Sequence, residues 1–121
     1  MLKANLELNN ITNVIATNAA VSIDDSTVTI YLNDDEAGHS MYVRGSKSIQ
    51  VKSVSLQNIF ESNSIKKCDF LKVDCEGEEY PIMDSLPITH YDKITKICIE
   101  YHFADTRPEL LEDLIKKIKS F

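Results

Sequence analysis

The chain has 121 residues, 43% of them hydrophobic, and a formal net charge of −6. This length suits one compact domain over residues 1–121, and the hydrophobic share is that of a folded protein rather than a disordered one. No apolar stretch approaches the roughly 18 to 20 residues of a membrane span, and residues 1–15 lack the apolar core of a signal peptide. We therefore expect a cytoplasmic protein without membrane contact. The acidic balance also argues against a nucleic-acid partner, because such binding depends on Lys and Arg neutralising phosphates.

The first third of the chain predicts a helix followed by two strands. Residues 2–8 place leucines on one helical face, and the asparagines at positions 9 and 10 end that helix. Residues 14–21 contain short apolar runs that predict a mostly buried strand. Residues 26–32 alternate apolar and polar side chains, as a half-exposed strand does, and a polar loop is expected over residues 33–40.

The middle of the chain predicts a third strand, a short helix and a fourth strand. Apolar and polar residues alternate again over residues 49–56, but the phase slips at Lys52–Ser53, which indicates a bulge or a strand end. A short helix is expected from about residue 55 to residue 62. Residues 70–73 are predicted to form a short buried strand because they form an apolar run interrupted by a single lysine.

The last third predicts a helix, a strand and a second helix. Residues 78–85 are expected to be helical, and Pro81 is compatible with this helix only because it falls in the first turn. Residues 94–103 predict a strand with a continuous apolar core. Thr106 and Glu109 have the spacing of a capping box at the start of the final helix. The apolar stripe of that helix comprises Leu110, Leu111, Leu114, Ile115 and Ile118.

Helices that alternate with buried strands predict an α/β domain with a largely parallel sheet. The two alternating strands in the middle of the chain add an antiparallel hairpin excursion to that sheet. The sequence shows no repeats and no linker, so we expect the whole chain to form a single domain.

Two of the predicted strands end in side chains that suit a functional site. Asp74 and Glu76 end the first, and Glu100 and His102 end the second. Residues two apart on a strand share a face, and open parallel sheets bind ligands beyond the carboxyl ends of their strands. If the two strands are neighbours, we expect three carboxylates and an imidazole to converge on one crevice. Gly77, directly after the first pair, lets the backbone turn sharply there.

Lys72 is a charged residue within an apolar strand, on the same face as Asp74. We expect it either to pair with an acid at the strand end or to reach solvent along the sheet surface. A purely structural interpretation makes the acids solvated strand-end residues, with Glu100 pairing to a nearby lysine. Carboxylates and imidazole together also suit Mg, Mn, Fe or Zn. One alternative is therefore a metal-dependent hydrolase that uses the four strand-end side chains, although we assign no metal ligands.

The other chemically active side chains give no further motif. The odd number of cysteines, without a C-x-x-C spacing, predicts buried free thiols rather than a disulfide framework or a zinc knuckle. These cysteines are Cys68, Cys75 and Cys98. His39 and His90 lie in polar loop contexts, and we expect neither to act directly. No nucleophile motif, phosphate-binding loop or G-x-G-x-x-G is present among the three glycines of the chain.

The stretch from Lys72 to Glu79 resembles the signature of the FkbM family of S-adenosylmethionine-dependent methyltransferases. The family pattern runs as a strand, then Lys-Ile-Asp-Val-Glu-Gly-Ala-Glu, then a helix. The matching positions are Lys72, Asp74, Glu76, Gly77 and Glu79. Glu78 replaces a small residue, and Pro81 is atypical. Other stretches resemble the family in the same order, so the resemblance covers nearly the whole chain; they are residues 2–10, 18–22, 51–56 and 97–102.

The resemblance implies part of a Rossmann-like class I methyltransferase sheet, mixed with the antiparallel hairpin and lacking the first strands. The family's first strand, its glycine-rich turn and its second strand would precede Met1, and its closing strands would follow Phe121. Because the first strands hold most of the cofactor, the resemblance implies a chain that is inactive alone. Sheet edges left open by their absence would invite pairing with another chain, so we expect a homodimer or a rearranged sheet.

The resemblance also implies roles for individual residues. Asp74 and Glu76 would face the methyl-transfer site as base or acceptor-orienting groups. Glu100 and His102 are second candidates, and Lys72 completes the candidate catalytic set. The cofactor would be S-adenosylmethionine, with two residues near its adenine side, which are Asn18 and Ala20.

The expected activity is O-methyl transfer to a small molecule such as a sugar. The sulfonium of the cofactor is already activated, so the protein has to supply orientation and a base for the accepting group. The alternatives are a non-catalytic relic or interaction module that keeps the sheet without the cofactor site, and the metal-dependent hydrolase described above.

Overall fold

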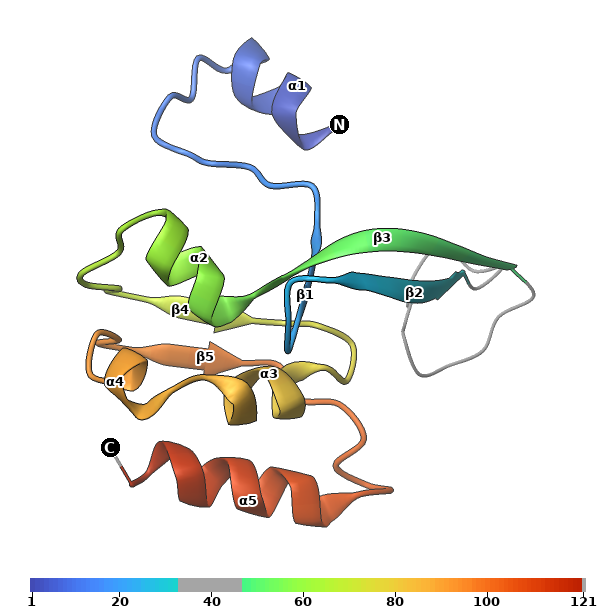
Figure 1. Cartoon of the computed structure of the whole chain (residues 1–121), viewed down its shortest axis with the longest axis vertical. Coiled ribbons are helices and arrows are strands. Elements are labelled where there is room, and N and C mark those ends of the chain that lie inside the picture. Colours follow the sequence, from blue (N-terminus) through green and yellow to red (C-terminus); the bar gives the residue numbers. More distant parts are fainter. Residues whose placement is uncertain (33–46, 121) are drawn as a thin grey trace.

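The computed structural model describes residues 1–32 and 47–120, and the predicted loop over residues 33–40 and His39 fall outside them (Figure 1). The described part is a mixed α/β structure with two small sheets. In chain order its elements are α1 (Leu2–Leu8), β1 (Ala20–Ser22), β2 (Thr27–Leu32), β3 (Lys47–Ser55), α2 (Leu56–Ser62), β4 (Leu71–Val73), α3 (Glu79–Ser85), α4 (Ile88–Tyr91), β5 (Ile97–Ile99) and α5 (Pro108–Ile118). Within these residues, every helix is too short or too polar to cross a bilayer.

The first sheet has the order β1-β3-β2, and its central strand changes partner along its length. The first part of β3 pairs antiparallel with β2, ending with Lys52 opposite Thr27. The next residue, Ser53, lies opposite Ala20 and begins a parallel pairing with β1. The strand runs unbroken through this point, so the predicted strand end at Lys52–Ser53 is wrong. The slip in the sequence pattern instead marks the position at which β3 changes its pairing partner from β2 to β1.

The second sheet is the parallel pair β4–β5. Lys72 lies opposite Cys98 in this pair, and the Glu100 N–H donates to the Val73 carbonyl at 2.9 Å just beyond it. The two strands whose ends carry the acids and the imidazole are therefore neighbours, as the sequence predicted. Because they are parallel, both carboxyl ends lie at the same edge of the sheet.

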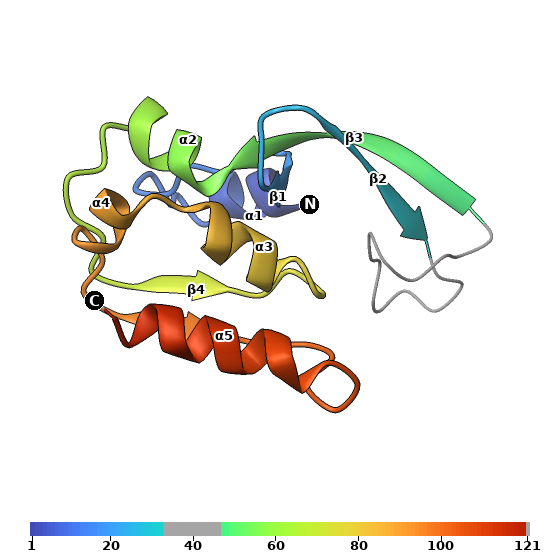
Figure 2. The same cartoon turned by 60° about the horizontal axis from the view of Figure 1, so that its bottom comes forward.

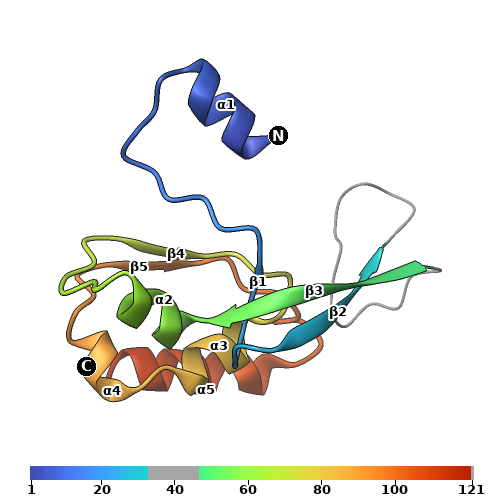
Figure 3. The ribbon, with the colours of Figure 1, turned by 45° about the horizontal axis from the view of Figure 1, so that its top comes forward.

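The helices cover one face of the β4–β5 pair. Figure 3 shows α3, α4 and α5 on the same side of these strands, and Figure 2 shows the same helices from another side. Helix α3 contacts α5. Ile82 and Met83 of α3 are 1% and 0% exposed, which makes this helix the centre of the core. The other buried apolar side chains are Leu56, Phe60, Val73, Tyr80, Leu86, Tyr91 and Leu114. Lys72 and Cys98 lie on the opposite face, which is exposed.

Several apolar residues that the sequence assigned to buried strands are exposed. Val14 and Ile15 are 48% and 81% exposed and precede β1, so the predicted strand over residues 14–21 is reduced to its last residues. Phe70 is 60% exposed and lies before β4. Strand β5 has three residues rather than the ten predicted, and exposed Cys98 contradicts the expectation of three buried thiols. An apolar side chain is buried only where another element covers it, and the pattern alone does not show the cover.

Two local predictions about helices are also wrong. Helix α5 has no capping box, because Pro108 occupies its first turn and the Thr106 hydroxyl donates back to the Phe103 carbonyl at 3.3 Å. His90 was expected in a polar loop, but it is buried in α4 with its ring edge-on to Phe60 at 5.5 Å. Helices α1, α2 and α3 and strand β2 lie within a residue or two of their predicted bounds.

The two sheets are separate in the described part of the chain, where β1 pairs with β3 alone and β4 with β5 alone. The expected continuous sheet is therefore not found over these residues, and one edge of β1 and one edge of β4 carry no paired strand there. Helix α1 has no buried residue and projects away from the rest (Figure 1). Unpaired strand edges are templates for pairing with another chain.

We expect the chain to form a homodimer through these edges. Light scattering after size exclusion should give about twice the chain mass of 13.7 kDa. Phe70→Lys, directly before β4, should shift the protein toward the monomer because a charge beside an edge strand opposes strand pairing. Ile88→Lys is the matched control, since Ile88 is similarly exposed but lies in α4. A single-chain mass at every concentration would contradict the dimer.

Candidate functional site

The candidate site is formed by the two loops that leave the carboxyl ends of β4 and β5. The loop after β4 turns through two consecutive left-handed residues, Glu76 at φ 50° and Gly77 at φ 108°. Glycine accepts this conformation without cost, which confirms the expected sharp turn. A residue with a side chain, such as Glu76, adopts the same conformation only with backbone strain. The loop after β5 contains a third left-handed residue, Phe103 at φ 60°. Strained backbone of this kind is often concentrated at functional sites.

The carboxylate of Glu79, in the first turn of α3, holds the first loop in place. Its side chain is 0% exposed. Oε1 accepts the Cys75 N–H at 2.7 Å and Oε2 accepts the Gly77 N–H at 2.9 Å. A buried carboxylate requires such donors, because leaving water without replacement hydrogen bonds costs several kcal/mol. Glu79 therefore stabilises the strained turn through hydrogen bonds on its buried side.

The same carboxylate also reaches the second loop. Oε1 of Glu79 lies 3.0 Å from Nδ1 of His102. Because a carboxylate only accepts hydrogen bonds, this contact assigns the proton to Nδ1. Tyr80 fixes the backbone of the same histidine, since its hydroxyl donates to the His102 carbonyl at 2.6 Å. The imidazole is thus held on its inner side and presents Nε2 outward, 3.5 Å from the Glu76 carboxylate at the rim.

Lys72 pairs with the strand-end acids, as one of the two sequence-based alternatives predicted. Its ammonium lies 2.7 Å from Asp74 and 3.9 Å from Glu100. The hydrogen bond from Lys72 holds the pKa of the Asp74 carboxyl below its ordinary value, and the same bond raises the pKa of Lys72. Asp74 is therefore a weaker proton acceptor than an ordinary carboxylate.

Asp74, Glu100 and His102 converge closely enough to consider a metal ion. One ligand atom from each lies within 4.8 Å of the other two. Two carboxylates and an imidazole suit a divalent cation in their chemistry. The ammonium of Lys72 already lies against both carboxylates, so a metal would have to compete with an internal cation.

All five predicted catalytic residues meet at this edge, whereas the two predicted cofactor residues lie apart from them. Ala20 begins β1 and is half-buried, and Asn18 is exposed just before it. Strand β1 contacts α3, which is the element that connects Ala20 to the rest of the site. Within the described residues, no hydrogen bond or ion pair links Asn18 or Ala20 to the acids.

Glu79 is the residue of the candidate site that reasoning from the sequence did not single out. It was noted as a match to the family pattern but was not assigned to the site. A signal was present, because Glu79 lies three and four positions before Ile82 and Met83 and so shares their buried helical face. A charged residue on such a face needs specific partners, here two backbone N–H groups and an imidazole.

This α/β domain, which carries a cluster of acids and an imidazole at its strand ends, matches a known protein family. The family model described as "Methyltransferase FkbM domain" matches residues 2–121. The chain therefore belongs to the FkbM methyltransferase domain family. No curated protein and no solved structure gives a significant match to the chain.

Replacing Lys72 by methionine should raise the pKa of the Asp74 carboxyl toward its ordinary value, since the bond that lowers it is lost. Because the folded-state pKa is lowered, the pair stabilises the fold above the usual carboxyl range and ceases to do so as pH falls through the folded-state value. Carboxyl-carbon NMR titration of both proteins measures this shift. Lys67→Met is the matched control, because Lys67 pairs with Asp69 instead. An unchanged Asp74 midpoint in Lys72→Met would show that the contact is absent in solution.

Proposed function

We propose that this chain provides the acceptor-binding and general-base side of S-adenosylmethionine-dependent O-methyl transfer to a small-molecule hydroxyl. Membership of the FkbM methyltransferase domain family supports the reaction class. The observation that carries the assignment of roles is the buried Glu79 carboxylate, 3.0 Å from His102 Nδ1. A base oriented by a third group is the usual arrangement for activating an accepting hydroxyl.

The negative charge of the strand-end residues is complementary to the positive charge of this cofactor. S-adenosylmethionine carries a positive sulfur, and three carboxylates lie at the strand ends, those of Asp74, Glu76 and Glu100. Opposite charges at this range attract. Once bound, the cofactor supplies a methyl group that needs no further activation. By resemblance to the family, Asn18 and Ala20 would contact its adenine side.

His102 is the proposed general base. With its proton on Nδ1, the imidazole offers the lone pair of Nε2 to the hydroxyl proton of the acceptor. Glu79 holds the ring in this tautomer and stabilises the imidazolium that forms. Glu76, 3.5 Å from Nε2 and 47% exposed, adds a second negative charge beside that cation. Once His102 carries both protons, each of its nitrogens faces a carboxylate.

The other strand-end residues have supporting roles in this proposal. Asp74 is bound by Lys72, which lowers the pKa of its carboxyl and makes it a poor base. Glu100 is 61% exposed and lies 3.9 Å from the same ammonium. We assign both acids to orienting the acceptor and to the negative surroundings of the cofactor, with Lys72 fixing their positions.

Two further points remain predictions. The first is that the chain requires a glycine-rich segment or a partner for activity. The alternative to this prediction is that the chain is a non-catalytic interaction module. The second is a divalent-cation-dependent hydrolase, favoured by the group of Asp74, Glu100 and His102. Metal analysis of the purified protein separates the second alternative from methyl transfer.

His102→Gln should abolish methyl transfer while leaving cofactor binding unchanged. Loss of a general base typically lowers the rate about 10²- to 10⁴-fold. The assay follows radiolabelled methyl groups from S-adenosylmethionine to a panel of sugars and hydroxy acids, and calorimetry measures cofactor binding separately. Glu112→Gln, an exposed acid on α5, is the control and should retain full activity.

The two measurements distinguish the ways in which the proposal can fail. Wild-type transfer that survives in His102→Gln would remove the histidine from its assigned role. No heat with millimolar cofactor would rule out catalysis by this chain alone and favour the interaction module.

A further inference from the structure

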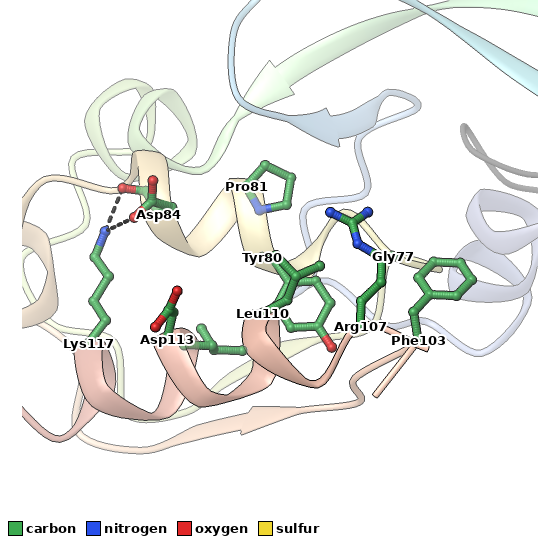
Figure 4. A pocket seen from close by; sticks show the side chains of 10 residues that line it. Gly77, Tyr80, Pro81, Asp84, Phe103, Arg107, Leu110, Asp113 and Lys117 are labelled. Carbon is green, nitrogen blue, oxygen red and sulfur yellow. Dashed lines mark hydrogen bonds and ion pairs between the residues drawn. The ribbon is translucent and has the colours of Figure 1, made fainter. Parts of the chain in front are cut away.

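A groove lies between α3 and α5, on the side of these helices that faces away from the β4–β5 strands. Its volume is about 700 Å³, within the usual range for small-molecule sites. Tyr80 and Pro81 of α3 line one wall, and Leu110 and Leu114 of α5 line the other. Figure 4 shows Tyr80, Pro81 and Leu110 beside the space between the two helices. The walls are mainly apolar, which suits the body of an apolar ligand.

The charged groups of the groove are closely paired at one end and more loosely paired at the other. Lys117 binds Asp84 at 3.0 Å, and Asp113 binds Lys116 at 3.1 Å, so the acids at this end are each paired with a lysine. Arg107 lies at the other end, beside Gly77 and Phe103 (Figure 4). The most loosely paired cation of the groove is therefore Arg107, whose nearest acid is Glu109 at 3.8 Å.

The guanidinium of Arg107 is partly exposed and only loosely paired, so it can still donate hydrogen bonds to an anion. Its side chain is 54% exposed, and its nearest acidic contact is from Nε to Glu109 at 3.8 Å, which is longer than a hydrogen bond. In Figure 4 the guanidinium extends toward Pro81 and Gly77. It also precedes the first turn of α5, where the helix dipole favours negative charge and no side chain caps the helix. A planar guanidinium binds carboxylate and phosphate through two parallel hydrogen bonds.

We propose that this groove binds an amphipathic anion, with a carboxylate or phosphate on Arg107 and an apolar chain lying along α5 toward Lys117. Arg107, Leu110, Leu114 and Lys117 follow one another along one face of the helix. At 1.5 Å per residue they span about 15 Å, the length of a chain of roughly ten carbons. The site is distinct from the cluster at His102, because its lining includes none of the predicted catalytic residues.

The groove and the candidate catalytic site meet at one loop. Gly77 lines the groove, and its N–H is held by the same Glu79 carboxylate that holds His102. Phe103 lines the groove and directly follows His102. A ligand at the Arg107 end therefore contacts the outer side of the loop that carries Glu76.

NMR titration of the whole chain tests this proposal without requiring cofactor or activity. The probes are octanoate, octyl phosphate and the neutral octanol. Octanoate or octyl phosphate should shift the amides of residues 77–84 and 107–117, and the stronger of the two identifies the preferred headgroup. Arg107→Gln should weaken anion binding by about tenfold or more, as expected for loss of a charge-assisted hydrogen bond. Lys66→Gln, which removes an exposed charge on the connection between α2 and β4, should leave it unchanged.

Three results would overturn the proposal. Equal binding of octanol and octanoate, or unchanged anion affinity in Arg107→Gln, would show that the arginine does not select an anion. Shifts scattered over exposed apolar residues such as Ile15 and Ile23 would show unspecific association. Concentration-dependent shifts of the same amides without any probe would identify a second copy of the chain as the occupant. None of these results depends on whether the chain transfers methyl groups.

Discussion

The structure of the candidate site depends on one buried carboxylate. Glu79 is fully inaccessible to solvent and satisfies its oxygens with two backbone N–H groups of the strained loop and with the imidazole of His102. Without these donors a charge at this position would cost several kcal/mol, and without the carboxylate the turn at Glu76 and Gly77 would lose its support. The same hydrogen bonds to Glu79 therefore stabilise both the buried charge and the strained turn. This constraint fixes the end of β4, the end of β5 and the start of α3 relative to one another.

The two sides of that loop have different chemistry. On the strand-end side, Nε2 of His102 lies 3.5 Å from the carboxylate of Glu76. On the helix side, Gly77 and Phe103 border a groove in which Arg107 is the most loosely paired cation. Both sides border backbone whose N–H groups Glu79 binds. If both proposals hold, we expect binding at one side to affect the other through this shared loop.

The sequence predicted those features that depend on short-range pattern. Two apolar runs that each lead into polar strand ends predicted the parallel neighbours β4 and β5. A charged residue within a strand needs a partner, and Lys72 pairs with Asp74. Features that depend on which element covers another were not predictable. Val14 and Phe70 are apolar but exposed, because no described element covers them. The change of partner at Lys52–Ser53 looked like an interruption, since alternation within one strand cannot show which neighbour each part has.

The central claim is that Glu79 holds His102 with its proton on Nδ1 and leaves Nε2 free to accept a proton. Long-range ¹H–¹⁵N correlation of the His102 ring tests this directly, at a pH of about 8, where imidazole in water is neutral. The account predicts a protonated Nδ1 and an unprotonated Nε2, with this pattern lost in Glu79→Ala. A ring protonated at Nε2 alone, or a pattern unchanged in Glu79→Ala, would contradict it.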